Sequence, residues 1–332
     1  MTTPTFAKLV KVYIDSASIE RLKCGKPNEG TVRNTLSGVR TFRRWLNVRR
    51  ENRGLLPFAF PVSEDYDGFG SDDSPLVSII TPRMIHVYLA DMLKRKVKPV
   101  TAVSYVTQLQ QLFAKWVRPY YEDHGWKIPA FPSFGKRIQT PRYNRPSREL
   151  LAKVKQWYES ISDDRVYPAR RSNVSGRQIW FVATMMLEFA MRNSDIGRLS
   201  RSNFISQEGR IFLNYIPHKT MNSSARMVKW PVHSLIWNRL MKGNVNGTAE
   251  DLDLPELDQE VFDALNRQMR SLGFTGSKGA YELRKICIDH IYQQFGAEKA
   301  VSVSGDNIRT IMYYYADPAQ PNIGDLRVTD LL

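Results

Sequence analysis

The sequence contains only two cysteines, Cys24 and Cys287, and only five histidines among its 332 residues. Two isolated cysteines exclude a disulfide framework and a cysteine-rich zinc site. The histidines show neither i, i+4 pairing nor an HExxH motif, so a metal site is not expected. We therefore predict a protein that uses no metal and no small-molecule cofactor.

Long apolar runs are also missing. No stretch approaches the ~18 uninterrupted apolar residues that a membrane span requires. The first eight residues, Met1 to Lys8, lack the basic and then apolar pattern of a signal peptide. The sequence thus predicts a cytoplasmic protein without a membrane partner.

Acidic residues are outnumbered, with 33 Asp and Glu against 48 Lys and Arg, which gives a net charge of +15. A hydrophobic fraction of 42% is ordinary for a folded protein, so disorder throughout is not expected. The excess of positive charge favours a polyanionic partner, foremost nucleic acid. A generally basic, well-solvated surface is the alternative interpretation.

The length of 332 residues exceeds what one core usually supports, and it predicts two domains. Residues 1–132 repeat apolar side chains at i, i+3 and i+4, which predicts a helical domain interrupted by a long loop over 51–78. A basic cluster lies at the end of one predicted helix and is a candidate for DNA-phosphate contacts. It consists of Lys94, Arg95, Lys96 and Lys98.

Residues 133–148 carry five basic residues, two prolines and no acid, a composition that predicts an extended linker. We expect this linker to lie against DNA and to join two halves that close around a duplex. Its candidate phosphate contacts are Lys136, Arg137, Arg142 and Arg145.

The remainder, residues 149–315, reads as a mostly helical domain with a small antiparallel sheet. Helices are predicted over 148–160 and 178–191, the second apolar almost all round and hence central. Residues 211–216 and 227–232 are rich in β-branched and aromatic side chains, which predicts a hairpin. Residues 257–315 return to helical periodicity.

Four motifs of chemical interest follow one another in this domain. The first is Arg192 in Ala-Met-Arg-Asn-Ser-Asp-Ile-Gly-Arg-Leu, the second is Lys219 at the tip of the predicted hairpin, and the third is Arg284 in Tyr-Glu-Leu-Arg-Lys. The last is Gly-Asp306 followed by a Tyr-Tyr-Tyr run that ends at Tyr315. Each motif alone is weak, because arginines often cap helices and tyrosine clusters often only pack.

In this order the motifs resemble the catalytic domain of the tyrosine recombinases, or phage-type integrases, over about residues 145–315. The resemblance implies an N-terminal helical, SAM-like core-binding domain and a metal-free reaction on DNA. It also implies that Arg192 and Arg284 bind the scissile phosphate, that Asp195 supports the first arginine, and that Lys219 is the family's mobile β-strand lysine.

The chemistry explains these residue types. Attack of a phenol on a phosphodiester places extra charge on the non-bridging oxygens, and two guanidiniums are planar, permanently charged donors for it. The phosphotyrosine conserves bond energy for religation, so no ATP is required. A lysine on a mobile hairpin can protonate the departing 5′-oxygen as general acid.

Two positions depart from the family pattern. Tyr281 stands where the family has a histidine, and Asp306 stands where it has a histidine or tryptophan. A phenol can still hydrogen-bond a phosphate oxygen, whereas Asp306 would repel a phosphate unless protonated or turned away. The nucleophile is Tyr315 or Tyr314; counting nine residues from Asp306 favours Tyr315.

The resemblance further implies assembly on DNA. Two protomers would bind inverted half-sites of double-stranded DNA, and four would exchange strands, with the tail 316–332 docking into a neighbouring protomer. It implies a nucleoid-associated protein in a bacterial or phage-type context, encoded on a mobile genetic element. Two other functions stay open: a catalytically impaired DNA-binding accessory protein of the same fold, and a type IB-like topoisomerase.

Overall fold

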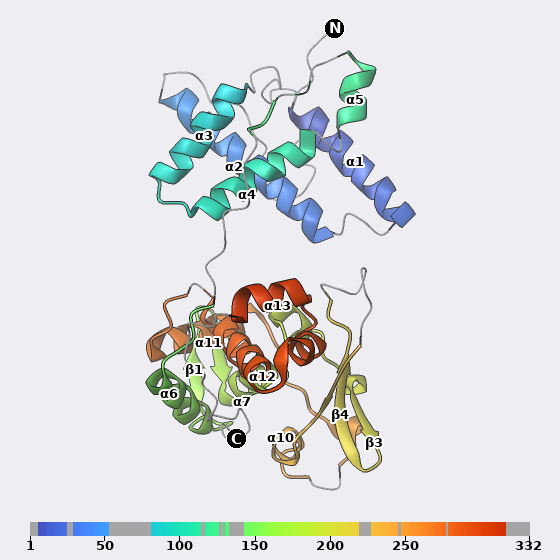
Figure 1. Cartoon of the computed structure of the whole chain (residues 1–332), viewed down its shortest axis with the longest axis vertical. Helices are drawn as coiled ribbons and strands as arrows, with labels where there is room; N and C mark the ends of the chain where they lie inside the picture. The colour runs from blue at the N-terminus through green and yellow to red at the C-terminus, as the bar shows by residue number, and fades with distance from the viewer. Residues whose placement is uncertain are drawn as a thin grey trace. The chain divides into compact units, whose positions relative to one another are not determined.

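The computed structural model divides the chain into two compact units, Met1–Thr140 and Pro141–Leu332 (Figure 1). The division falls inside the stretch 133–148 that the sequence marks as a linker. The described residues are 6–24, 29–52, 81–113, 117–125, 128, 130–132, 143–218, 227–244, 247–276 and 278–316. Each unit has its own apolar core.

The first unit is helical over its described residues. Its helices are α1 (Phe6–Cys24), α2 (Glu29–Glu51), α3 (Pro82–Lys94), α4 (Pro99–Gln111) and α5 (Arg118–Asp123). Thr81 is the N-cap of α3, and its hydroxyl accepts the Met84 amide N–H; Pro82 takes the first helical position, where no amide N–H is needed. The predicted loop over 51–78 lies outside the described residues apart from 51 and 52.

An aromatic cluster holds α2 and α3 together. The rings of Phe42 and Tyr88 meet edge to face at 5.0 Å between centroids, and Trp45 lies 5.1 Å from Tyr88. Trp45 also donates its indole N–H to Asp91 at 2.9 Å. The helical periodicity thus buries one face of each helix, as predicted.

The second unit combines helices with two small antiparallel sheets. Its helices are α6 (Arg148–Glu159), α7 (Gly176–Leu187), α8 (Asn193–Ile196), α10 (Ser234–Leu240), α11 (Gln259–Leu272), α12 (Gly279–Ser304) and α13 (Ile308–Tyr315), with 3-10 turns η4 (Arg201–Asn203) and η5 (Ala249–Asp251). Its strands are β1 (Val166–Pro168), β2 (Asn173–Ser175), β3 (Phe204–Gln207), β4 (Arg210–Tyr215) and β5 (Val228–Pro231). The predicted fold class, mostly α with small antiparallel sheets, is confirmed.

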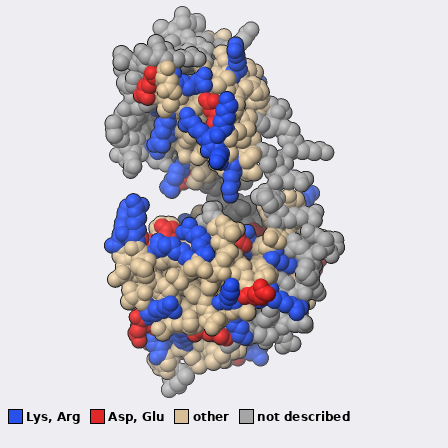
Figure 2. Space-filling view, turned by 90° about the vertical axis from the view of Figure 1, so that its left-hand side faces the viewer, with Lys and Arg blue, Asp and Glu red and all other residues tan. Residues whose placement is uncertain are grey.

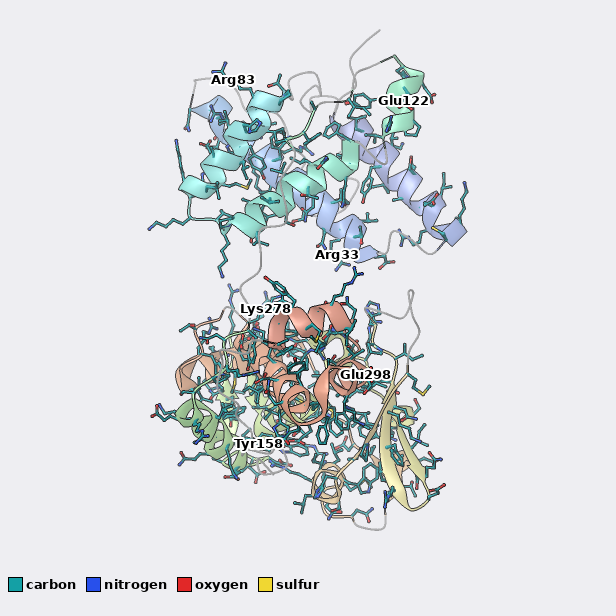
Figure 3. The ribbon with its side chains drawn as sticks, viewed as in Figure 1. Arg33, Arg83, Glu122, Tyr158, Lys278 and Glu298 are labelled. Atoms are coloured by element: carbon teal, nitrogen blue, oxygen red, sulfur yellow. The ribbon has the colours of Figure 1, made fainter. Side chains whose placement is uncertain are left out.

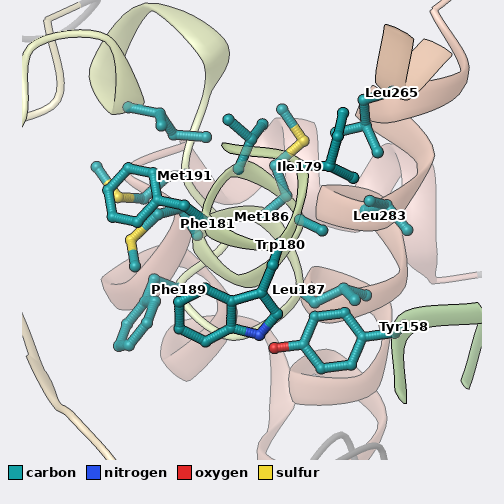
Figure 4. Packing of buried hydrophobic residues seen from close by; sticks show 14 of the residues in the cluster. Tyr158, Ile179, Trp180, Phe181, Met186, Leu187, Phe189, Met191, Leu265 and Leu283 are labelled. Atoms are coloured by element: carbon teal, nitrogen blue, oxygen red, sulfur yellow. The ribbon is translucent and has the colours of Figure 1, made fainter. Parts of the chain in front are cut away.

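Helix α7 is the centre of this unit. Ile179, Trp180 and Phe181 are buried on different sides of it, and Leu265 of α11 and Leu283 of α12 pack around them (Figure 4). Ser175 and Gln178 form a capping box at its start.

The helix ends at Leu187, four residues before the predicted end. Ala190 has a left-handed φ of 49°, and the Met191 amide N–H reaches back to the Met185 carbonyl at 3.0 Å. The apolar pattern continues past the end of the helix because residues 189–191 remain buried in the core.

The second sheet has the order β3-β4-β5, with Leu213 opposite Trp230 and Tyr215 opposite Val228. β4 and β5 are the predicted strands; β1, β2 and β3 were not predicted. β3 joins β4 through Glu208 and Gly209, whose φ angles of 51° and 71° suit a two-residue hairpin turn of right-handed twist. Within the described ranges, none of the helices has the length and apolar character needed to cross a bilayer.

Candidate active site

Arg284 is the most deeply buried charged residue of the candidate site, with a side-chain exposure of 0% on α12. Its Nη2 donates to the Asp306 carboxylate at 2.6 Å and to the Ser304 carbonyl at 3.1 Å. Its Nε donates to the Tyr281 hydroxyl at 3.3 Å, one helical turn back. The guanidinium is therefore held by three separate acceptors, two on α12 and one in the turn that follows it.

Arg192 approaches from another element. It is the N-cap of α8 in extended conformation, directly after the turn that ends α7. Its Nη2 donates to the second Asp306 oxygen at 2.5 Å, and its Nη1 lies 3.7 Å from Asp195 Oδ2. Arg192 Nη1 and Arg284 Nη1 are buried and make no hydrogen bond among the described residues.

Asp306 thus bridges the two arginines, with one carboxylate oxygen for each. It follows Gly305, which ends α12 with a left-handed φ of 62°, and its own amide N–H donates to Ser304 Oγ at 3.1 Å. This carboxylate is not turned away from the arginine pair. A single anion already lies where two guanidiniums converge.

Asp195 connects the arginine pair to the hairpin. Its Oδ1 accepts the His218 amide N–H at 2.9 Å, and the side chain is almost fully buried. His218 is the last described residue before the hairpin tip. Lys219 follows it and lies outside the described residues.

The tyrosine run lies on α13, whose N-cap is Asn307; the Asn307 side chain accepts the Thr310 amide N–H at 2.8 Å. Tyr315 is buried, with 7% exposure, and its ring packs against Tyr143 at 5.4 Å. Burial raises the pKa of Tyr315 far above its ordinary value, and the Arg284 charge opposes this rise. Tyr314 and Tyr313 are half-buried and their rings meet edge to face at 5.2 Å.

The candidate DNA contacts divide into three groups. Lys94, Arg95, Lys96 and Lys98 are all exposed at the end of α3. Lys136, Arg137 and Arg142 lie outside the described residues. Arg145 is placed differently from the sequence-based expectation: its side chain is 7% exposed and its Nε donates to Asp289.

Two sets of residues were missed from sequence. Arg33, Arg40 and Arg44 stand at i, i+7 and i+11 of α2, on one face, and Arg33 projects outward from the helix (Figure 3). Figure 2 shows one face of the molecule on which the first unit carries several Lys and Arg side chains and few acids. Asp289 was the other omission; a lone acid within Ile-Cys-Ile-Asp on an apolar helix face required a buried partner.

Three or more His, Cys, Asp or Glu side chains do not gather into a possible metal site anywhere in the described part of the chain. The two carboxylates nearest the arginines, the buried Asp195 and the half-buried Asp306, face guanidiniums.

No family model matches the sequence, and no curated protein matches it. Solved structures do match. The XerH site-specific recombinase bound to difH substrate has 14% identity and a TM-score of 0.54, covering 95% of this chain and 94% of that chain. Lambda integrase (residues 75–356) bound to DNA has 14% identity and a TM-score of 0.55, covering 96% and 99%.

A third similar structure is the Tn1549 transposon integrase in complex with a circular intermediate DNA. It has 10% identity and a TM-score of 0.53, covering 93% of this chain and 95% of that chain. At such identities the likeness concerns the fold. The fold that the motif order predicted is therefore confirmed, and this chain has the fold of the tyrosine recombinases.

Proposed function

We propose that this protein is a site-specific DNA recombinase or integrase that cleaves and rejoins strands through a 3′-phosphotyrosine intermediate. One observation carries the proposal: Arg192 and Arg284, from separate elements, direct N–H groups at a single carboxylate that immediately precedes the tyrosine-bearing helix. Two guanidiniums converging on one anion are suited to a phosphodiester.

In the proposed reaction the scissile phosphodiester displaces the Asp306 carboxylate from between the arginines. The phenol of Tyr315 releases its proton to solvent as its oxygen attacks phosphorus, so that a tyrosine–phosphorus bond forms while the bond to the 5′-oxygen breaks. Both guanidiniums stabilise the charge that develops on the non-bridging oxygens. Attack by the 5′-hydroxyl of a partner strand reverses the step and rejoins the DNA.

Lys219 is proposed to donate the proton that the departing 5′-oxygen requires. Asp195 supports this role through the neighbouring residue, because it holds the His218 amide N–H at the start of the hairpin. Tyr281 is proposed to hydrogen-bond a phosphate oxygen in place of the family's histidine; its hydroxyl already lies 3.3 Å from Arg284 Nε.

DNA binding is proposed to involve both units. In the first unit the exposed cluster Lys94, Arg95, Lys96 and Lys98 and the α2 arginines supply phosphate contacts. Lys136, Arg137 and Arg142 supply further contacts from the linker. Affinity that rests on phosphate contacts falls steeply with salt concentration. The DNA-bound XerH and lambda integrase structures support double-stranded DNA as the partner.

The proposed assembly is a dimer on inverted half-sites and a tetramer across two sites, with no membrane partner and no small-molecule cofactor. A lambda integrase dimer bound to a COC′ core site supports the first of these states. The tail 316–332, proposed to dock into a neighbouring protomer, lies largely outside the described residues. A protein with these roles acts in the cytoplasm, at the nucleoid.

A second candidate function is DNA binding without cleavage, as an accessory protein of the same fold. The observation that favours it is the Asp306 bridge, because both arginines of the site already share an anion. A carboxylate that no phosphate could displace would leave a DNA-binding protein without activity.

Covalent trapping on a nicked suicide substrate, followed by peptide mapping, tests the two candidates. Wild type and Tyr314→Phe are expected to form an adduct on Tyr315, and Tyr315→Phe is expected to form none. Tyr313→Phe, a change of the same size on the same helix, is the control and should keep the adduct.

Two outcomes contradict the proposal in different ways. An adduct that survives the double replacement of Tyr314 and Tyr315 would show that the nucleophile is elsewhere. Full DNA affinity with no adduct from wild type would favour the accessory protein.

A further inference from the structure

Arg145, expected from sequence to contact DNA, forms a buried ion pair within the second unit. Its Nε donates to Oδ1 and Oδ2 of Asp289 at 3.0 and 2.9 Å. The side-chain exposures are 7% for the arginine and 3% for the aspartate. A guanidinium so enclosed has little surface left for a phosphate of a DNA backbone.

The same arginine also holds the end of the tyrosine helix. Its Nη2 donates to the backbone carbonyl of Tyr315 at 3.2 Å. The last carbonyls of a helix lack partners within the helix and carry partial negative charge, so a cation there is favourable. α13 has only eight residues, and an end contact therefore constrains a large part of it.

A second contact from the same segment acts on the tyrosine side chain. The Tyr143 ring packs against the Tyr315 ring at 5.4 Å, and both belong to one apolar cluster with Ile288 and Ile291 of α12. Residues 143–145 thus hold the Tyr315 backbone and its ring at once.

Asp289 connects Arg145, and through it Tyr315, to the helix that carries Arg284. It lies five residues after Arg284 on α12, so one helix carries both the anion-site guanidinium and the anchor of Arg145. Burial raises the pKa of Asp289, and the Arg145 charge opposes this rise. Removal of either partner would leave the other charge buried and uncompensated.

We infer that Arg145 and Asp289 are positioning residues that set the place of the tyrosine nucleophile relative to Arg284, without touching DNA. This inference rests on the proposed function, since it assigns the pair a part in the same reaction. The alternative is the phosphate contact expected from the sequence, and the two roles give opposite results when DNA binding and chemistry are measured separately.

The variants are Arg145→Ala, Asp289→Asn and Arg145→Lys, with Arg148→Ala as control. Arg148 is an exposed arginine three residues further on, so its loss changes the net charge equally. Arg145→Lys keeps the charge but loses the planar guanidinium, whose Nε meets both Asp289 oxygens while its Nη2 reaches the Tyr315 carbonyl. It serves as the test where the alanine variant does not fold.

Hydrogen exchange of the free protein gives the first readout, and it needs no activity. Arg145→Ala and Asp289→Asn should speed exchange of the α13 amides at least about tenfold while α7 stays protected, and Arg148→Ala should change neither. Unchanged α13 exchange in both pair variants would overturn the inference, whether or not wild type cleaves DNA. Wild type that forms no adduct would refute the proposed function instead.

Duplex affinity against salt and the single-turnover cleavage rate give the second readout. If the pair positions Tyr315, Arg145→Ala and Asp289→Asn should leave the DNA affinity and its salt dependence unchanged. Both variants should cleave at least about tenfold more slowly than wild type, and the rate of Arg145→Lys should lie between theirs and that of wild type. The double variant Arg145→Ala/Asp289→Asn should cleave about as slowly as either single variant, because each single change already removes the ion pair. A weaker Arg145→Ala complex with a salt slope lower by about 1, together with an unaffected Asp289→Asn, would establish a phosphate contact instead.

Discussion

The carboxylate of Asp306 lies against the buried guanidinium of Arg284, with 2.6 Å between Oδ2 and Nη2. Its other oxygen accepts from Arg192, so one residue neutralises part of the charge of both arginines. An anion that enters this site must first displace the carboxylate. This arrangement predicts that Asp306 weakens the binding of phosphate by the protein.

Asp306→Asn should therefore bind duplex DNA about tenfold more tightly, a gain of about 1.4 kcal/mol. The amide keeps an acceptor for one arginine but removes the competing charge. Fluorescence anisotropy at fixed salt measures the change. Asp163→Asn is the matched control, because Asp163 also joins two arginines, Arg177 and Arg239, within the same unit. Weaker binding by Asp306→Asn would mean that Asp306 holds the arginines in place and does not compete with phosphate.

Lys219→Ala should slow cleavage of ordinary DNA but leave cleavage of a 5′-bridging phosphorothiolate almost unchanged. Sulfur departs without a proton, so a general acid contributes only to the oxygen substrate, where it is typically worth 10²–10⁴-fold. Single-turnover rates on both substrates give the comparison. Equal slowing of the two would remove the general-acid role.

Gly305→Ala should lower the thermal midpoint and slow cleavage. The residue has a φ of 62°, and an added Cβ would lie 2.7 Å from Pro217 Cγ, in the segment that leads to Lys219. The left-handed conformation alone costs about 1–2 kcal/mol. Gly209→Ala measures the cost of the left-handed conformation alone, because Gly209 has a φ of 71° and nothing lies within 4 Å of the added Cβ. Equal losses in calorimetry would show that the Pro217 contact is unimportant.

Glu188→Gln should stabilise the protein increasingly as pH rises. Burial raises the pKa of Glu188 from its ordinary 4.5 to about 8, and its Oε1 has no hydrogen bond among the described residues. Between these values the folded protein keeps a proton that the unfolded chain releases, so wild-type stability falls as pH rises toward about 8.

The difference in thermal midpoint between Glu188→Gln and wild type should grow by a few degrees from pH 5 to pH 8 and then level off. The control is Glu298→Gln, an exposed glutamate on α12 (Figure 3). A difference that does not change with pH would show that Glu188 is solvated in the folded protein.

Several elements could be predicted because their signals are local. Apolar side chains at i, i+3 and i+4 determine which face of a helix is buried, and α2 and α4 follow that rule. α7 is apolar almost all round and is therefore buried on all sides. β4 and β5 were predicted from β-branched and aromatic residues. β1, β2 and β3 have only three or four residues each, too few for an alternation to show.

The members of the candidate site stay a prediction, and their contacts could not be read from the sequence. The order of Arg192, Lys219, Arg284 and Tyr315 along the chain indicated the fold, and the structure brings Arg192 and Arg284 to one carboxylate. The sequence alone left open whether Asp306 would turn away. In the structure, α12 ends at the left-handed Gly305, and this turn places the Asp306 carboxylate between the two guanidiniums.

By itself the sequence determined the helical character and the fold, because periodicity and motif order are properties of a linear pattern. The tertiary structure alone decided which charges meet. Arg145 reads as an exposed linker arginine, yet its partner Asp289 lies 144 residues away. A buried charge is stable only beside an opposite one, and that neighbour is chosen by packing in three dimensions.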